Sequence, residues 1–304
     1  MNVRFGYFLL FLAGLSVTMS SAYANVFDWP AAGNSVIGNI QYTTVADGET
    51  LLDIAERYGL GYADIRDANP DLDPWIPEVG VQVTLPTRFI LPETPWQGIV
   101  INLAEYRLYH FLPERKEIHS YPIGIGKTNT PTPKGDMEIT ARIPNPTWYP
   151  PASIRAAWEA QGREVRRQIP AGPDNPLGPF AIALSAKGYL IHGSNQAFGV
   201  GTQASAGCIR MNNWDIEHLV NHTQIGIEVR IIDHPVAVGI YANDLVLKVH
   251  RPLNQLSSPL SHTDLVYQLQ RVRQRQTVEI GNIDWNIVEQ IFTQQRGIAR
   301  IITL

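Results

Sequence analysis

The sequence of 304 residues contains a single cysteine, Cys208. Beyond the N-terminus it has no apolar run long enough to span a bilayer. Its 24 Lys and Arg residues are spread along the chain and the formal net charge is −4, which argues against the concentrated basic face of a nucleic-acid-binding protein. In an oxidising compartment a lone thiol has no disulfide partner within the chain, so a reactive role is the simpler expectation.

The first 24 residues have the pattern of a secretory signal peptide. A basic head ending at Arg4 precedes an apolar run from Phe5 to Met19, and Ala22-Tyr23-Ala24 is a small-residue cleavage signature. The apolar run of about 15 residues is shorter than the roughly 20 that a membrane anchor needs. We therefore predict that residues 1–24 are a signal peptide cleaved after Ala24, and that the mature chain has no membrane span.

Residues 41–87 have the pattern of a small strand-helix-helix-strand unit. Residues 41–45 alternate as a strand does, Thr50 can cap a helix and Gly59 can end it. The apolar residues of this first helix share one face: Leu51, Ile54, Ala55 and Tyr58. A second helix is expected over 62–68, and a strand over 81–86.

This unit resembles a LysM domain in two stretches, residues 45–55 and Ile65 to Pro70. LysM modules bind glycans that contain N-acetylglucosamine, such as peptidoglycan, so the resemblance implies glycan binding. The alternative is a small packing domain that binds no glycan, because a fold does not fix a function.

Residues 96–233 are rich in short strand patterns separated by Gly and Pro, which predicts a β-rich sandwich or barrel. The expected strands are 98–103, 107–111, 118–125, 137–141, 180–184, 189–191 and 227–232. A helix is expected to begin at Asn213, as its cap. Residues 25–40 and 88–95 are interpreted as linkers. Residues 234–304 are interpreted as a C-terminal extension, with helical spacing over Asp264–Arg275 and Ile283–Gln295.

Cys208 and His192 are the candidate catalytic pair. His192 ends an apolar run and precedes Cys208 by sixteen positions. An imidazole can take the proton of a thiol, whose pKa is ordinarily about 8.5, and can later protonate a leaving amine. The backbone N–H groups of Cys208 and Gly207 are candidate oxyanion donors. No carboxylate is placed to orient His192, so a backbone carbonyl is expected in that role. The alternative is a buried thiol near a hydrogen-bonded histidine.

The surrounding motifs resemble the YkuD family of L,D-transpeptidases. The signature of that family joins a His-Gly pair to Ser-x-Gly-Cys and a hydrophobic-Arg pair, matched here by His192-Gly193, Ser205-Ala206-Gly207-Cys208 and Ile209-Arg210. Further matching runs are 122–126 and 130–135, and 171–178 is similar to a periplasmic subgroup with an N-terminal LysM domain. The family usually has histidine where Ala206 stands, which leaves His192 to perform the acid–base chemistry alone.

The resemblance implies a β-sandwich catalytic domain that acts in the periplasm on peptidoglycan tetrapeptide stems. Cys208 would form a thioester with the diaminopimelate carbonyl and release D-Ala, and carbapenems would acylate the same thiol. The acceptor amine would belong to the terminal lysine of an outer-membrane lipoprotein, which the subgroup favours, or to a second stem, giving a 3→3 crosslink. Gly193, Ser205 and Gly207 would support the site. Arg210 would contact a stem carboxylate or pin its loop through a salt bridge.

Two other functions stay open. Water could take the acyl group, which would make an L,D-carboxypeptidase, or the chain could be a non-catalytic peptidoglycan-binding protein with a buried Cys208. No cofactor motif is present. His218 and His222 stand at i, i+4, a spacing that can bind zinc, but the sequence places no third ligand beside them. They are interpreted as surface histidines, with no metal site.

Overall fold

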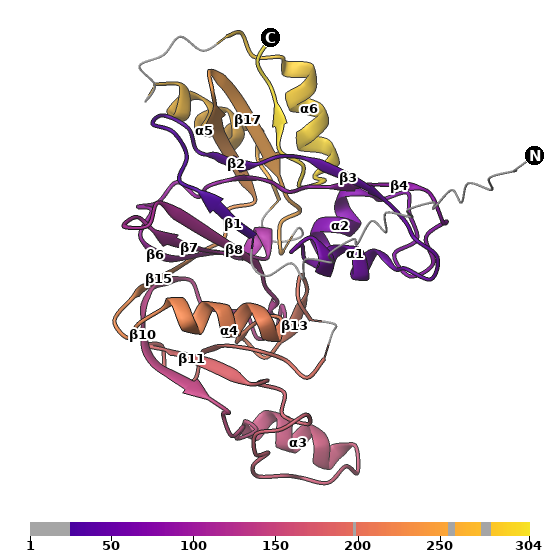
Figure 1. The fold of residues 1–304 in the computed structure, drawn as a ribbon, viewed down its shortest axis with the longest axis vertical. Coiled ribbons are helices and arrows are strands. Elements are labelled where there is room, and N and C mark those ends of the chain that lie inside the picture. The colour runs from indigo at the N-terminus through magenta and orange to yellow at the C-terminus, as the bar shows by residue number, and fades with distance from the viewer. Residues whose placement is uncertain (1–24, 197–198, 255–258, 275–280) are drawn as a thin grey trace, which may run out of the picture.

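The computed structural model describes residues 25–196, 199–254, 259–274 and 281–304, so the predicted signal peptide lies outside the described residues. The chain is built around one curled sheet of nine strands (Figure 1). In spatial order these are β1 (Asn25–Asp28), β8 (Glu117–Pro122), β7 (Arg107–Leu112), β6 (Gly98–Asn102), β15 (Glu228–Ile232), β10 (Gly135–Pro144), β11 (Phe180–Leu184), β12 (Leu190–His192) and β14 (Ile209–Arg210). Within the described residues, no helix has the length and apolar character needed to cross a bilayer.

The strands expected over 96–233 are confirmed, and so is a mostly-β catalytic region. The pairs β6–β15 and β12–β14 run parallel and the other neighbours in the sheet run antiparallel. The helix α4 (Asn213–His222) packs on β11 and β12 and also reaches β8, where Tyr121 meets His218. Its buried residues Ile216, Leu219 and Val220 belong to the main hydrophobic core, where they pack with apolar side chains of the sheet. Burial of this apolar surface stabilises the helix on the sheet.

The N-terminal unit forms as the sequence predicts. The strands β3 (Gln41–Thr44) and β4 (Gln82–Leu85) pair antiparallel beside α1 (Leu51–Arg57) and α2 (Tyr62–Ala68). Thr50 caps α1 in a reciprocal capping box with Asp53, whose backbone N–H lies 3.1 Å from the Thr50 hydroxyl. Gly59 follows the end of α1 with φ of 60°, a conformation that favours glycine.

This unit shares its core with the catalytic sheet. Val83 and Leu85 of β4 lie in the same buried cluster as Val100, Tyr109 and Phe111 of the sheet. The start of α2 also lies against the loop that precedes β13 (Gln203–Ser205). There the N–H of Tyr62 donates to the Val200 carbonyl at 3.3 Å, and a Cβ on Gly61 would come within 2.8 Å of the Gly201 Cα.

The two segments interpreted as linkers contain strands. β1 pairs with β8 and so forms the edge of the large sheet, while β2 (Val36–Gly38) pairs with β5 (Arg88–Ile90). The interpretation was wrong because each strand has only three or four residues, too few to show a period. Their pairing partners lie tens of residues away, and only the fold brings them together.

The helices expected in the C-terminal extension are confirmed as α5 (His262–Gln274) and α6 (Trp285–Gln294). Three strands that the sequence analysis did not anticipate accompany them: β16 (Val236–Tyr241), β17 (Asp244–Val249) and β18 (Arg300–Ile301). The extension folds against the rest of the chain, since Ser35 and Ile240 exchange hydrogen bonds of 2.8 and 2.9 Å. Another unexpected helix, α3 (Ala152–Ala160), projects from the far end of the molecule (Figure 1).

Candidate active site

The pairing of two short strands brings the candidate catalytic residues into one region. Cys208 lies between β13 (Gln203–Ser205) and β14, and His192 ends β12. In the parallel pair β12–β14, His192 stands opposite Arg210. Arg210 is two positions after Cys208, so Cys208 lies immediately before the strand that pairs with the strand of His192.

A backbone carbonyl orients His192. The imidazole Nδ1 lies 2.6 Å from the Gly193 carbonyl oxygen. A carbonyl can only accept, so Nδ1 carries the proton and Nε2 holds the free lone pair of a base. Burial lowers the pKa of His192 to about 4, although the bond to Gly193 opposes this change. The ring is therefore neutral near pH 7.

The Cys208 thiol is half-buried and protonated. Its Sγ donates to the Gly188 carbonyl at 3.7 Å, and burial raises the pKa of Cys208, against a backbone hydrogen bond from Leu190 and the charge of Arg210. Within the described residues, no hydrogen bond joins Cys208 to His192. The thiol and the imidazole are therefore both neutral near pH 7.

The Ser205 hydroxyl closes the cysteine loop on itself. It donates to the Cys208 carbonyl and accepts from the Gly207 N–H at 3.1 Å. Gly207 has φ of 107°, which side-chain-bearing residues rarely adopt, so glycine is needed at this turn. The expectation that the Gly207 N–H faces an oxyanion is not met here, because Ser205 accepts that donor. The Cys208 N–H is the other candidate.

Thr132 bonds to the cysteine loop from another segment of the chain. The sequence analysis did not identify it as a site residue. Its hydroxyl donates to the Gly207 carbonyl and accepts from the Gly126 N–H, both at 2.9 Å. Thr132 is 5% exposed, so this bridge is shielded from water. The signal in the sequence was the family-like run 130–135, which contains it.

Arg210 has no carboxylate partner among the residues that the structure describes. Its Nε is buried and makes no hydrogen bond there, and burial lowers the pKa of the guanidinium. Buried guanidinium groups are ordinarily paired. The salt-bridge alternative from the sequence therefore has no support in the described residues.

Asn213 holds the His-Gly turn. Its Oδ1 accepts from the Ser194 N–H at 2.9 Å, and a Cβ on Gly193 would come within 2.4 Å of the same oxygen. The sequence assigned Asn213 as the cap of α4, which is wrong because Asn212 occupies the N-cap position. A 280 Å³ groove lies beside this turn, and its lining includes Asn175, Ser194 and Asn213.

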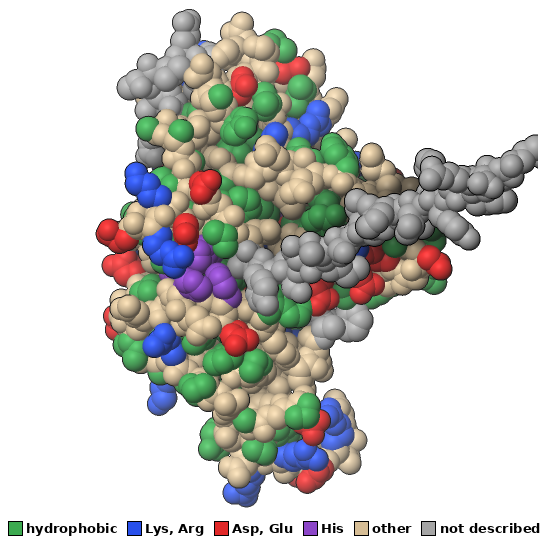
Figure 2. Space-filling model, in the orientation of Figure 1, with side chains coloured by type: hydrophobic (Ala, Val, Ile, Leu, Met, Phe, Trp, Pro, Cys, Tyr) green, Lys and Arg blue, Asp and Glu red, His purple; other side chains and the backbone are tan. Residues whose placement is uncertain are grey.

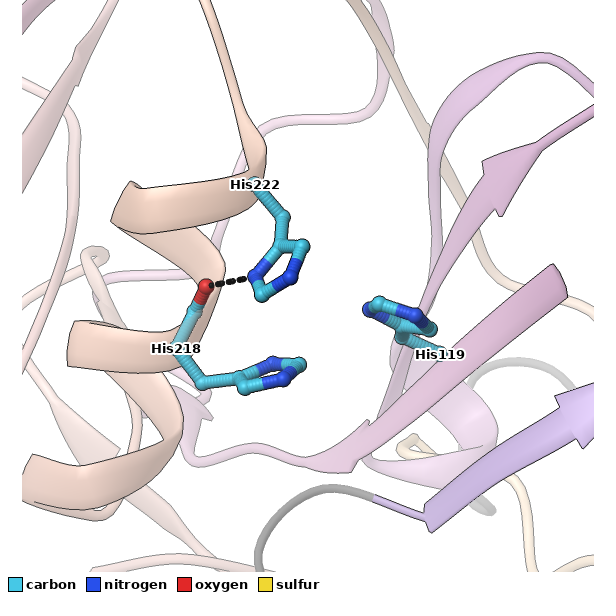
Figure 3. A group of neighbouring side chains, drawn as sticks. All are labelled: His119, His218 and His222. Atoms are coloured by element: carbon cyan, nitrogen blue, oxygen red, sulfur yellow. Dashed lines mark hydrogen bonds between the residues drawn. The ribbon is translucent and has the colours of Figure 1, made fainter. Parts of the chain in front are cut away.

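The histidines that the sequence treated as surface residues have a third neighbour. His218 and His222 of α4 face His119 of β8, and one potential ligand atom from each lies within 4.8 Å of the others (Figure 3). His119 is buried and the two helical histidines are half-buried. His119 lies 99 residues before His218, so the local spacing of histidines in the sequence could not identify it as a third potential ligand.

Comparisons with known proteins agree with the motifs. Residues 97–232 match the YkuD family, described as the L,D-transpeptidase catalytic domain, and residues 43–86 match the LysM domain. "Probable L,D-transpeptidase YcfS" of Escherichia coli is 40% identical over 254 residues, which cover 82% of this chain and 79% of that protein. "Probable L,D-transpeptidase ErfK/SrfK" of Escherichia coli is 36% identical over 258 residues, with 84% and 81% covered.

A solved L,D-transpeptidase from Mycobacterium smegmatis aligns with a TM-score of 0.33 at 16% identity, covering 51% of this chain and 64% of that one. The sequence relatives carry the assignment, because each exceeds 30% identity over most of both chains. The chain therefore belongs to the YkuD family of L,D-transpeptidases, in the group whose members also carry a LysM domain.

Proposed function

We propose that this protein is a cysteine L,D-transpeptidase that acts on the tetrapeptide stems of peptidoglycan. The observation that carries the proposal is the parallel pairing of β12 and β14, which brings a carbonyl-oriented His192 next to the loop that presents the only thiol of the chain. The names of the relatives point to the same reaction.

The first half of the reaction forms an acyl-enzyme. The Cys208 sulfur bonds to the carbonyl carbon of diaminopimelate while its proton passes to Nε2 of His192. The tetrahedral intermediate then collapses, the C–N bond to D-Ala breaks and the imidazolium returns the proton to the leaving amine. In the second half, an acceptor amine attacks the thioester, and His192 moves its proton to the departing sulfur.

Arg210 is the proposed contact for a carboxylate of the stem peptide. Its guanidinium is two residues from Cys208 and has no ion-pair partner among the described side chains, whereas a planar guanidinium suits bidentate carboxylate binding. Gly193, Ser205, Gly207 and Thr132 act as positioning residues, because their contacts fix the two catalytic loops.

The LysM unit is proposed to hold the enzyme on the glycan strands. The segment between α2 and β4 exposes Trp75 at 48%, Ile76 at 83% and Val79 at 59%, and apolar surface of this kind is typical of binding faces. Together with the predicted signal peptide, this supports a periplasmic enzyme of cell-wall synthesis. A non-catalytic glycan binder is the less favoured reading, because Cys208 is only half-buried.

The acceptor is proposed to be the terminal lysine of an outer-membrane lipoprotein, with a second stem as the other amine. Water is the acceptor in the carboxypeptidase alternative. The deciding experiment incubates the purified protein with tetrapeptide muropeptides, with and without a peptide ending in that lysine, and analyses the products by mass spectrometry.

The proposal expects D-Ala release and a product joined to the lysine peptide, both absent with Cys208→Ala. Crosslinked stems alone would change the acceptor, and tripeptide alone would favour the carboxypeptidase. Wild-type turnover by Cys208→Ala would overturn cysteine catalysis.

A further inference from the structure

His119, His218 and His222 form a cluster that the proposed reaction does not use. The ring centroids of His218 and His222 are 4.2 Å apart, and each lies about equally far from His119, at 5.0 and 5.1 Å. The two helical residues are one turn apart on α4, so both rings leave the same face toward β8 (Figure 3). Three imidazoles on two separate elements thus converge on one point.

The hydrogen bonds around the cluster leave Nε2 of both helical histidines without a partner among the described residues, and Nδ1 of His119 has only a long contact with the Tyr121 hydroxyl. Nδ1 of His222 donates to the His218 carbonyl at 2.8 Å, so its Nε2 has the lone pair. Nε2 of His119 lies 3.2 Å from the Glu117 carboxylate, which can only accept from it, so its Nδ1 has the lone pair. The Tyr121 hydroxyl lies 3.5 Å from that Nδ1, a long contact that a metal ion would replace. Nδ1 of His218 lies 2.9 Å from the Tyr121 hydroxyl, and in the tautomer in which Nδ1 donates to that oxygen Nε2 has the lone pair.

This is the pattern of metal-binding histidines. In such sites the ring nitrogen that does not bind the metal donates to a carboxylate, a carbonyl or water, which fixes the ring and raises its basicity. Glu117, the His218 carbonyl and the Tyr121 hydroxyl occupy those outer positions. Three neutral imidazoles gain little stability from lying this close together, whereas a cation bound by all three would stabilise the arrangement.

We propose that His119, His218 and His222 bind a divalent transition-metal ion, with zinc as the ion that best suits three nitrogen ligands. Zinc–nitrogen bonds of about 2.0–2.1 Å in tetrahedral geometry separate the ligand atoms by roughly 3.4 Å. The potential ligand atoms lie within 4.8 Å of one another, so the side chains would rotate toward each other when the ion binds. Water occupies the fourth position.

The site is reachable from solvent. His218 and His222 are half-buried, and Figure 2 shows histidine side chains as one surface patch between basic and acidic groups. Asn213, at the start of α4, contacts the turn after His192, while His222 is the last residue of the helix. A helix of ten residues is about 15 Å long, so the metal lies away from Cys208. Its role is to fasten the end of α4 to β8.

The test measures zinc binding to the full chain without a histidine tag, in a Cys208→Ser background, which removes the thiolate as a competing ligand. We expect one zinc ion per chain by equilibrium dialysis in a metal buffer. At free zinc 100 times the dissociation constant, the folding equilibrium should rise about 100-fold and the melting temperature should increase. Cobalt should give the absorption of a tetrahedral site without a thiolate charge-transfer band.

Three variants locate the site. His222→Gln should weaken binding by about 100-fold or more, and Glu117→Gln by about 10- to 100-fold, because the carboxylate acts through His119. His262→Gln is the matched control, since that exposed histidine pairs with Glu289 on the C-terminal extension, outside the cluster. Circular dichroism verifies that each variant folds.

Absence of stoichiometric zinc binding in the Cys208→Ser protein would overturn the proposal. Undiminished affinity in a folded His222→Gln variant would overturn it as well. The proposed transpeptidase reaction is independent of both outcomes, because it is measured on muropeptides with Cys208 present.

Discussion

Arg107 of β7 and Asp64 of α2 form a buried ion pair that joins the catalytic sheet to the LysM unit. The Nη2–Oδ2 distance is 2.7 Å, and the side chains are 0% and 3% exposed. Arg107 also donates to the Ser120 hydroxyl and lies over the Phe89 ring. The carboxyl of Asp64 accepts in addition from the Gly61 N–H at the start of α2. The pair therefore fixes the position of the LysM unit as well as its helix.

Breaking this pair should destabilise the protein strongly. Asp64→Ala leaves the Arg107 guanidinium buried without its counter-charge, which costs about 3–5 kcal/mol of unfolding free energy. Glu164→Ala removes one partner of the exposed pair with Arg166 and should change stability by less than about 1 kcal/mol. Urea unfolding measures both. Equal, small effects would contradict a structural role for the buried pair.

The pH profile of acylation should report a base with a low pKa. Because burial lowers the pKa of His192 to about 4, the ring stays neutral down to that pH and can accept the thiol proton. The rate of carbapenem acylation, followed by intact-protein mass spectrometry, should fall only as the pH drops through about 4. An acid limb near 6.5 would contradict it. His192→Ala should lower the rate by about 10²- to 10⁴-fold at neutral pH.

Arg210→Gln should weaken use of the stem peptide. Hydrogen bonds to charged groups contribute about 1.5–3 kcal/mol, so kcat/KM should fall roughly 10- to 150-fold. Arg210→Lys should recover part of this, because it restores the charge without the planar fork. The melting temperature separates the alternatives: a large loss of stability in Arg210→Gln with unchanged KM would mean that Arg210 only orders its loop.

Thr132→Val tests the bridge between the two loops. The substitution keeps the shape of the side chain but leaves the Gly126 N–H and the Gly207 carbonyl without their partner, at a cost of about 1–3 kcal/mol. Acylation should slow because Gly207 precedes the nucleophile. Thr140→Val, at an exposed threonine of β10, is the control. If both variants behave alike in urea unfolding and acylation, Thr132 is not a positioning residue.

Asp215 should make stability fall as the pH rises. Burial raises its folded pKa to about 7 from an ordinary 3.8, so between these values the folded state holds a proton that the unfolded state has lost. The unfolding free energy contributed by this group therefore falls by about 2–3 kcal/mol from pH 5 to pH 7 and levels off about one pH unit above the folded pKa.

The matched variant is Asp215→Asn, which cannot ionise and should lack this loss. Its stability relative to wild type should improve by that amount between urea titrations at pH 5 and pH 8. Glu217→Gln, at an exposed acid on the same helix, should show no such change. A constant difference between Asp215→Asn and wild type at both pH values would contradict the assignment.

Local patterns were enough to predict several elements. Thr50, Gly59 and the apolar face of α1 specify that helix within ten residues, and the structure has it as predicted. The central strands were also predicted, since four to six alternating or apolar residues are visible in one window. The strands β1, β2 and β5 were not, because three or four residues carry no clear period and their partners are distant.

For this protein, the sequence by itself determined the family, the candidate pair Cys208 and His192, and the elements whose signals are local. Only the tertiary structure decided that Gly193 orients the imidazole, that Ser205 accepts the Gly207 N–H, that Asp64 meets Arg107 and that His119 joins the helical histidines. Spacing along a chain specifies turns and periodic faces. Protonation states and contacts between distant strands depend on burial and pairing, which exist only after the chain has folded.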